Sequence, residues 1–573
     1  MPPSTRLNYR RVWPALAVLL ALAGLLALTS DVYAGTTERV SVSSAEVGAL
    51  GGANFSASIS ADGRYVAFES LATNLVAGDT NNSWDVFVRD RQLGTTERVS
   101  VTSAEMQVMD GGSFAPSISN DGRFVTFWSD TGTLVAGDTN VMVDIFLRDR
   151  QLGTTERVSL TSAEAQVLDG DSFNPVISAD GRFIAFESYS ATLVAGDTNE
   201  WVDIFVRDRT LGTTERVSVN SSEAQGTNGD SIAAEMSADG RYIAFSSDAV
   251  GLVTGDSNNN TDVFVRDRTA GTTERASVDS AEGQADNGLS LSPGISSDGR
   301  YITFYSDATD LVASDTNGLG DIFVRDRTAG TTERVSLDSA ESETSDNDNL
   351  SPAISGNGRF VAFFSNSTEL VAGDSNGWFD VFVRDRTLGI TVRASVNSAE
   401  AQALNGASVT PAFSDNGFVL AFESQATNLV TGDGNNLNDV FVRTFDDDGD
   451  LVHEHDDNCP DWANPAQNLP AWTVPANDPD CDGFTNAQEL HVGTDPAKHC
   501  NSTGTGNDEP DAWPADINDS MFTTLADISS FNATYNKGPG QMGYSQRHDL
   551  NQSNFVSLAD VSMLNTFYNK TCQ

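Results

Sequence analysis

Short runs of alternating apolar and polar residues recur along most of the chain, and they predict an all-β fold. In the first copy the runs cover residues 56–60, 64–70, 85–91 and 95–101. They are rich in Val, Ile, Phe and Tyr, which favour strands. Asp62-Gly63 separates the first two runs and Leu93-Gly94 separates the last two, as expected for tight turns between antiparallel strands. Each copy is therefore predicted to form one four-stranded sheet.

The copies follow one another at a fixed spacing of 59 residues. Gly-Thr-Thr-Glu-Arg begins at Gly35, Gly94, Gly153, Gly212, Gly271 and Gly330, and Gly-Ile-Thr-Val-Arg begins at Gly389. Seven such sheets predict a seven-bladed β-propeller. The seventh copy has a third strand at 439–443 but no fourth, whereas 36–42 is a strand that precedes the first blade. We expect 36–42 to complete the seventh blade and close the ring, which removes a free sheet edge.

Residues 60–70, Ser-Ala-Asp-Gly-Arg-Tyr-Val-Ala-Phe-Glu-Ser, and their counterparts at 178–188 and 237–247 resemble the TolB-type propeller repeat. The resemblance extends over residues 35–443 and implies the propeller fold. That family includes periplasmic interaction proteins, the propellers of some peptidases and secreted proteins of unknown role. The resemblance therefore implies no single activity.

Composition narrows the chemistry. The chain has 573 residues with 81 acidic and 33 basic side chains, a net charge of −48, which disfavours binding to nucleic acid. All the histidines, cysteines and lysines lie after residue 443, so the propeller lacks the residues of a Ser-His-Asp or Cys-His triad, a Schiff base or an imidazole metal site. We predict a non-catalytic binding protein. The alternatives are a polysaccharide hydrolase or lyase that uses propeller carboxylates, and a purely structural envelope or matrix protein.

The two longer connections of each unit, 43–55 and 71–84 in the first, are predicted to lie together on one face, where recognition is usually built. Four aromatic residues in the second kind of loop interrupt the repeat: Trp84, Trp201, Trp378 and Phe379. Aromatic side chains on a polar rim can stack on a sugar ring or anchor a protein partner. The alternative is that they pack on neighbouring loops.

The same loops carry Asp-x-Asn-x-x-x-Asp in every copy. The first three copies are Asp79, Asn81 and Asp85; Asp138, Asn140 and Asp144; and Asp197, Asn199 and Asp203. Oxygen ligands at this spacing suit Ca²⁺. The alternative is an Asx-type turn in which Asp and Asn satisfy backbone donors.

Residues 1–34 are predicted to be a signal peptide. Arg6, Arg10 and Arg11 precede an apolar stretch at 12–28, and Val32-Tyr33-Ala34 offers a cleavage site before Gly35. A retained signal anchor is the alternative. No other segment of the sequence is apolar enough to cross a membrane, so we expect a secreted or cell-surface protein.

Residues 444–512 are predicted to be a calcium-binding linker. Asp446, Asp448 and Asp450, followed by Asp-Asp-Asn-Cys-Pro at 456–460, resemble a thrombospondin type 3 calcium repeat. The segment 478–489 fits the EF-hand loop pattern, with Gly483 at the sharp turn. Its predicted ligands are Asp478, Asp480, Asp482, the carbonyl of Phe484, Asn486 and Glu489.

Residues 513–573 contain a second duplication, displaced by 33 residues, that resembles a dockerin module. The predicted calcium ligands are Asp516, Asn518, Ser520, Phe522, Thr524 and Asp527 in the first loop, and Asp549, Asn551, Ser553, Phe555, Ser557 and Asp560 in the second. The resemblance implies docking to a cohesin-like or other cell-surface protein. Both copies carry Leu-Ala where dockerins contact cohesin, and Gly is replaced at the sixth loop position, so the identity of the partner stays open.

The four cysteines are Cys459, Cys481, Cys500 and Cys572. In an exported region with little apolar core they are expected to form two disulfides. Three pairings exist, and sequence order favours 459–481 with 500–572. A zinc site with nearby histidines is the alternative.

Overall fold

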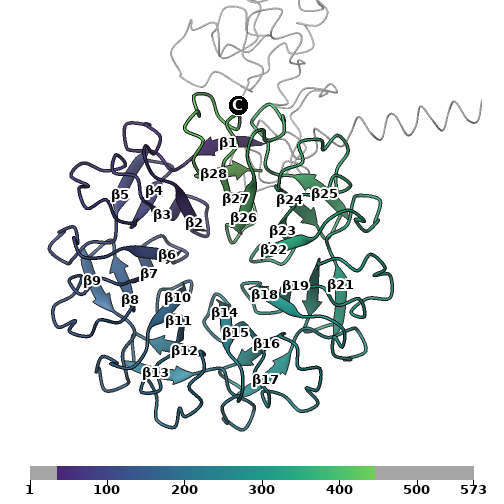
Figure 1. The fold of residues 1–573 in the computed structure, drawn as a ribbon, viewed down its shortest axis with the longest axis horizontal. Coiled ribbons are helices and arrows are strands. Elements are labelled where there is room, and N and C mark those ends of the chain that lie inside the picture. The colour runs from purple at the N-terminus through teal and green to yellow at the C-terminus, as the bar shows by residue number, and fades with distance from the viewer. Residues whose placement is uncertain (1–34, 446–573) are drawn as a thin grey trace, which may run out of the picture. The chain divides into compact units, whose positions relative to one another are not determined.

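The computed structural model describes residues 35–445; the predicted leader, calcium loops, dockerin-like repeats and cysteines lie outside these residues. Within this range the regular elements are all strands, and they form seven four-stranded antiparallel sheets around a central axis (Figure 1). This arrangement confirms the predicted seven-bladed propeller.

In blades 1 to 6 the strands run in chain order from the axis outward. Blade 1 contains β2 (Asn54–Ile59), β3 (Tyr65–Ser70), β4 (Asp85–Asp90) and β5 (Thr95–Arg98). Blade 2 contains β6 (Ser113–Ile118), β7 (Phe124–Ser129), β8 (Asp144–Asp149) and β9 (Thr154–Arg157). Blade 3 contains β10 (Ser172–Ile177), β11 (Phe183–Ser188), β12 (Asp203–Asp208) and β13 (Thr213–Arg216). Blade 4 contains β14 (Ser231–Met236), β15 (Tyr242–Ser247), β16 (Asp262–Asp267) and β17 (Thr272–Arg275).

The remaining blades repeat this pattern. Blade 5 contains β18 (Ser290–Ile295), β19 (Tyr301–Ser306), β20 (Asp321–Asp326) and β21 (Thr331–Arg334). Blade 6 contains β22 (Asn349–Ile354), β23 (Phe360–Ser365), β24 (Asp380–Asp385) and β25 (Ile390–Arg393). Blade 7 contains β26 (Ser408–Phe413), β27 (Val419–Ser424), β28 (Asp439–Thr444) and the N-terminal strand β1 (Thr36–Arg39).

Blade 7 closes the ring as the sequence predicts. β1 pairs antiparallel with β28, with Thr36 opposite Thr444 and Arg39 opposite Phe441. The strand ends at Arg39 rather than at residue 42, because the chain there turns into a small hairpin that bridges Val42 to Gly48. The equivalent outer strands of the other blades are shorter than predicted for the same reason.

The apolar core lies between neighbouring blades. The two middle strands of each blade have buried side chains on both faces, and Phe68 and Phe87 of blade 1 stack with ring centroids 5.9 Å apart. Val66 and Phe68 belong to one buried cluster with Val440 and Val442 of blade 7. Each blade therefore buries its apolar faces against the neighbouring blades, and the closed ring covers all of them.

The loop after each outer strand departs from expectation. The tip of its hairpin packs along the side of the next blade and does not lie on the face predicted for the longer loops. In the first copy Glu46 pairs with Arg89 at 2.5 Å, and the Ser44 hydroxyl accepts the Thr96 backbone N–H at 2.9 Å. The tip thus covers the outer edge of β5, which would otherwise expose unpaired backbone donors. The loops between the second and third strands, such as 71–84, remain on the predicted face, termed here the loop face.

The opposite face is held by a ring of backbone hydrogen bonds. Each turn between the first and second strands donates to the same turn of the next blade, for example Ala61 to Asn120 at 3.1 Å, and Asn416 donates to Ala61 at 3.5 Å to close the circle. Seven backbone segments at the ~4.8 Å spacing of hydrogen-bonded chains enclose a ring roughly 11 Å across between backbone centres. The turns therefore narrow the central channel at this face.

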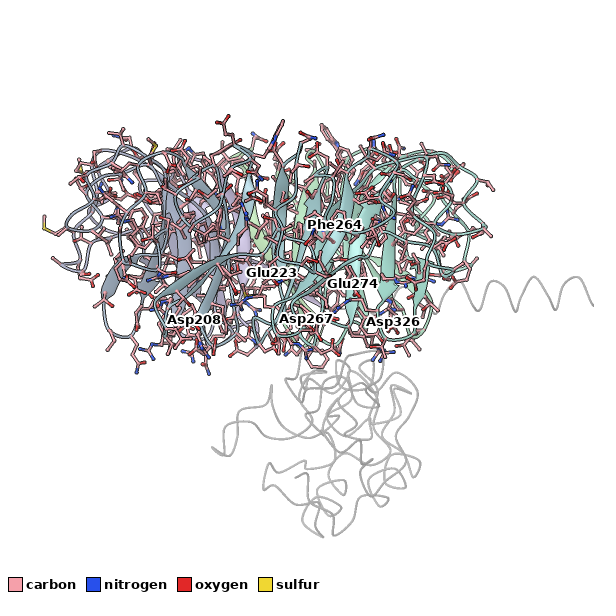
Figure 2. All side chains as sticks on the ribbon, turned by 90° about the horizontal axis from the view of Figure 1, so that it is seen from below. Asp208, Glu223, Phe264, Asp267, Glu274 and Asp326 are labelled. Carbon is pink, nitrogen blue, oxygen red and sulfur yellow. The ribbon has the colours of Figure 1, made fainter. Side chains whose placement is uncertain are left out.

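Charged residues on this turn face are already paired. Asp208, Asp267 and Asp326 lie along one edge of the propeller (Figure 2), and each accepts two hydrogen bonds from an arginine of its own blade. The bonds from Arg241 and Arg300 lower the pKa of Asp267 and Asp326 to about 2. These groups fix the turns and offer little to a ligand, which leaves the loop face and the channel as the candidate sites.

Candidate functional site

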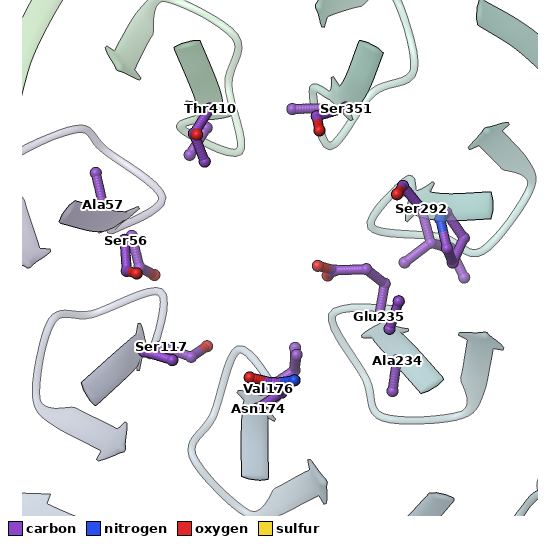
Figure 3. Close-up of a pocket in the computed structure, with 18 of the residues that line it drawn as sticks. Ser56, Ala57, Ser117, Asn174, Val176, Ala234, Glu235, Ser292, Ser351 and Thr410 are labelled. Atoms are coloured by element: carbon purple, nitrogen blue, oxygen red, sulfur yellow. The ribbon is translucent and has the colours of Figure 1, made fainter. Parts of the chain in front are cut away.

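The seven inner strands surround a central cavity of about 660 Å³ (Figure 3). Each inner strand contains a bulge after its second residue, as the pairing of β2 with β3 illustrates. The third residue of every inner strand has a left-handed φ between 45° and 55°: Ser56, Ala115, Asn174, Ala233, Ser292, Ser351 and Thr410. Seven non-glycine residues in this region are unusual and strained. In three blades the bulge turns a backbone N–H toward the neighbouring blade.

In three blades a glutamate from the second strand accepts the bulge N–H of the next blade. Glu69 accepts from Ala115 at 2.6 Å, Glu187 from Ala233 at 2.8 Å and Glu423 from Ser56 at 2.7 Å. Burial raises the pKa of all three carboxyls, that of Glu423 to about 7. We term these residues the brace glutamates. They were not singled out in the sequence, although their presence at one position in only three of seven copies was visible.

The other four blades place Trp128, Ser246, Tyr305 and Phe364 at the brace position. In blades 1 to 3 aromatic side chains from several strands form a continuous series, termed the aromatic run. The ring centroids lie 5.7 Å apart for Phe55 and Trp84, 6.2 Å for Trp84 and Phe114, 4.3 Å for Phe114 and Trp128, 5.5 Å for Trp128 and Phe173, and 6.4 Å for Phe173 and Tyr189.

The aromatic run lies at the strand ends that border the loop face. Phe55 is the second residue of β2, Trp84 directly precedes β4, and Trp128 is the penultimate residue of β7. Tyr189 is 53% exposed and the other members are half-buried. The run crosses two blade boundaries, and the corresponding inner-strand residues of blades 4 to 7 are Ile, Leu, Leu and Val. A nearly sevenfold ring thus carries one asymmetric aromatic surface.

The four aromatic residues predicted to contact a ligand have different environments. Trp84 belongs to the aromatic run, between Phe55 and Phe114. Trp201 and Trp378 are 41% and 47% exposed. Phe379 packs edge-on against Phe364, with centroids 5.4 Å apart, as the packing alternative predicts. The structure therefore brings Trp84 into a larger surface and leaves Trp201 and Trp378 as separate exposed rings.

A single glutamate also points into the cavity from blade 4. Glu235 is the fifth residue of β14, and Figure 3 shows its carboxylate directed toward the channel axis. Burial raises the pKa of this carboxyl to about 7. Among the residues between 35 and 445 that line the cavity, Glu187 is the only other ionisable one. The sequence analysis did not identify Glu235.

The Asp-x-Asn-x-x-x-Asp loops have the contacts of the Asx-turn alternative. Asn81 donates to Asp85 at 2.9 Å, and its side-chain oxygen accepts the backbone N–H of Ser83 at 3.2 Å. The Arg98 guanidinium lies 3.2 Å from Asp79 and from Asp85. An arginine lies likewise between Asp138 and Asp144 and between Asp197 and Asp203. In each of these loops an arginine therefore lies between the two carboxylates that the calcium prediction names.

Between residues 35 and 445, no group of three or more Asp, Glu, His or Cys side chains is arranged to hold a metal ion. A helix long and apolar enough to span a membrane is also not found in this part of the chain. The predicted calcium ligands between 446 and 560 lie outside the described residues, so those predictions stand as they were made.

No protein-family model matches the sequence, and no curated protein does. Solved structures with the same fold include a TolB from Agrobacterium tumefaciens, at 19% identity and a TM-score of 0.32 over 52% of this chain and 83% of that one. An oligogalacturonate lyase from Vibrio parahaemolyticus has 9% identity and a TM-score of 0.43 over 73% and 92%. The β-propeller domain of a Pyrococcus furiosus protease, described as having an open velcro topology, has 10% identity and a TM-score of 0.41 over 68% and 95%. At these values the likeness concerns the fold alone.

Proposed function

We propose that this chain is an exported, non-catalytic binding protein whose propeller recognises a neutral glycan through the aromatic run. The observation that carries the proposal is the asymmetry of this surface: six aromatic rings lie in contact across blades 1 to 3, whereas the inner strands of blades 4 to 7 have Ile, Leu, Leu and Val in place of phenylalanine. One face of a pyranose ring consists mainly of C–H groups and packs well on aromatic rings. Trp84 and Tyr189 offer such surfaces at the loop face.

Polar groups beside the aromatic run suit sugar hydroxyls. Glu69 is the cross-strand partner of Phe55, and Glu187 is the partner of Phe173, so a carboxylate lies beside the run in blade 1 and in blade 3. Carboxylates accept strong hydrogen bonds from hydroxyl donors. An aromatic floor with carboxylates beside it can therefore bind both the apolar and the polar parts of a sugar.

Charge favours a neutral glycan over an acidic one. Every arginine between residues 35 and 445 forms an ion pair with an Asp or Glu side chain. The propeller has no lysine or histidine, and the net charge of the chain is −48. A polyuronate would meet a negative field without an available cation to offset it.

The test is a binding panel with the full chain. Neutral polysaccharides such as laminarin, xylan and galactan form one arm, and polygalacturonate forms the other. We expect binding in the first arm only, and at least tenfold weaker binding for Trp84→Ala, which corresponds to about 1.4 kcal/mol. Tyr189→Ala removes an exposed ring at the end of the run and has less risk of unfolding. Trp378→Ala, an exposed ring in blade 6, is the matched control and should bind normally.

The enzymatic alternative requires carboxylates that are available for proton transfer. Glu69 and Glu187 each already accept a backbone N–H with one carboxylate oxygen, which leaves the second oxygen to accept a ligand hydroxyl. We expect no release of reducing sugar or unsaturated uronate from any polymer in the panel. Release that is lost in Glu187→Gln, with folding unchanged, would establish the alternative instead.

In the same proposal the tail docks to a partner protein in the presence of calcium. The support is the sequence of its loops, from Asp478 to Glu489 and the duplicated loops that follow. The test is capture of secreted and envelope proteins by the full chain, with calcium or with a chelator. A partner retained only with calcium, and lost in Glu489→Gln or Asp516→Ala, is the expected result; equal capture under both conditions would contradict it.

A further inference from the structure

Glu235 is the one ionisable side chain at its position in the seven inner strands. Its counterparts are Ser58, Ser117, Val176, Gly294, Ala353 and Ala412. These side chains are small or apolar, so the other six blades leave the channel open at this position. Blade 4 alone extends a carboxylate toward the axis here (Figure 3). Because the repeat is otherwise strict, a glutamate in only one copy of this position indicates a function specific to blade 4.

Glu235 does not have the role of a brace glutamate. Each brace glutamate accepts a bulge N–H of the next blade, whereas the Glu235 side chain forms no hydrogen bond or ion pair with any residue between 35 and 445. Desolvation is the sole cause of its raised pKa, of about 7. A partly desolvated acid without a partner destabilises a protein when it ionises. A ligand that brings positive charge would offset that cost.

The surroundings of Glu235 limit the ligand. The cavity has a volume of about 660 Å³, and hydroxyl groups of Ser292, Ser351 and Thr410 lie in its wall. Calcium is a poor fit because it takes six to eight oxygen ligands, and the described residues include no group of three acidic or imidazole side chains around a common point. A single carboxylate with neutral hydroxyl acceptors matches an ammonium group, which carries one charge and three N–H donors.

We propose that the central channel binds a compact organic ammonium group, with Glu235 as its counter-ion. The group enters from the loop face, because the ring of turns narrows the other end of the channel. Its ammonium donates to the Glu235 carboxylate and its remaining donors meet hydroxyls or water in the wall. An amino sugar and a lysine-type side chain both carry this chemistry. The inference rests on the channel and not on the aromatic run. A failure to bind glycans would therefore not overturn it, and its own failure would not overturn glycan binding.

The test is calorimetric titration of the full chain with three probes at pH 8. n-Butylammonium is the minimal ligand, and glucosamine and Nα-acetyl-lysine amide distinguish a sugar from a peptide as the carrier. n-Butanol is the uncharged control. We expect at least one ammonium probe to bind and n-butanol not to bind, with binding at least tenfold weaker in Glu235→Gln. Glu200→Gln makes the same charge change in an exposed loop and should bind like the parent.

The repeat provides a second variant. Ala353 occupies the Glu235 position in blade 6, so Glu235→Gln combined with Ala353→Glu returns a carboxylate to the channel from another wall. Restored binding shows that the channel carboxylate is the binding group. The proposal is overturned if none of the ammonium probes binds, if Glu235→Gln binds them as tightly as the parent, or if the folded double variant does not regain binding.

Discussion

Glu235→Gln is expected to stabilise the propeller at pH 8 and to change its stability little at pH 4.5. The folded state raises the pKa of this carboxyl from 4.5 to about 7. Between these values the folded protein binds more protons than the unfolded chain, so stability falls as pH rises. The stabilisation present below pH 4.5 is lost once the pH passes 7. Glutamine has nearly the same shape and does not ionise, so it avoids this loss.

The magnitude follows from the size of the pKa shift. A difference of about 2.5 units, at about 1.36 kcal/mol per unit, gives roughly 3 kcal/mol as an upper figure. Glu235 is only partly buried and retains contact with the channel, so we expect roughly 1–3 kcal/mol at pH 8. Glu187, the other ionisable residue of the cavity wall, is unchanged in both proteins and contributes little to the difference.

The assay is guanidinium unfolding of the full chain, followed by tryptophan fluorescence at pH 4.5, 6 and 8. The difference in unfolding free energy between Glu235→Gln and the parent should grow with pH. Glu200→Gln, in an exposed loop, should show no such trend. An equal difference at all three pH values, or none at pH 8, would refute the view that the carboxylate is desolvated and unpaired.

Four further substitutions test the packing that positions the site, each measured as the change in unfolding free energy. Phe264→Ala removes a fully buried ring that stacks 5.9 Å from Phe245, and should cost about 3–5 kcal/mol; a cost below about 1 kcal/mol would contradict the assigned core. Gly122→Ala should destabilise more than Gly137→Ala, because both residues have positive φ but only the first would push its methyl group into the Tyr65 ring. Arg98→Met leaves Asp79 and Asp85 without their shared cation and should cost about 3–5 kcal/mol. Millimolar calcium should raise the unfolding free energy of Arg98→Met more than that of the parent. Equal increases in both proteins would contradict the view that the Arg98 guanidinium takes the place of a cation between Asp79 and Asp85.

The propeller and its closure were predictable because they depend on local pattern. Alternating apolar residues, Asp62-Gly63 at the first turn and a constant repeat length define each sheet without reference to distant contacts. The unpaired strands at both ends then indicate that β1 pairs with β28. Strand ends were less predictable, since the backbone leaves the ladder at Arg39 to form a hairpin whose contacts lie in the next blade.

The candidate site was only partly predictable, because its residues come together across blades. Trp84 was identified as a break in the repeat, but Phe114 and Trp128, which continue the run from it, appear from sequence to be ordinary strand residues. Glu235 also alternates like any strand residue, and only the ring places it in the channel. Arg98 was the missing partner of the Asp-x-Asn-x-x-x-Asp loop, since it lies on the outer strand beyond the motif. A position-by-position comparison of the seven copies would have found Glu235 as the only charged residue in its column.

Hydrogen exchange of the full chain, with and without a bound neutral glycan, tests the central claim most directly. The claim is that the ligand lies on the aromatic run of blades 1 to 3. We expect slower exchange in 71–84 and in the bulged ends of β6 and β10, with unchanged exchange in the equivalent segments of blades 5 and 6. Slower exchange confined to blades 5 and 6 or to the turn face would contradict the claim.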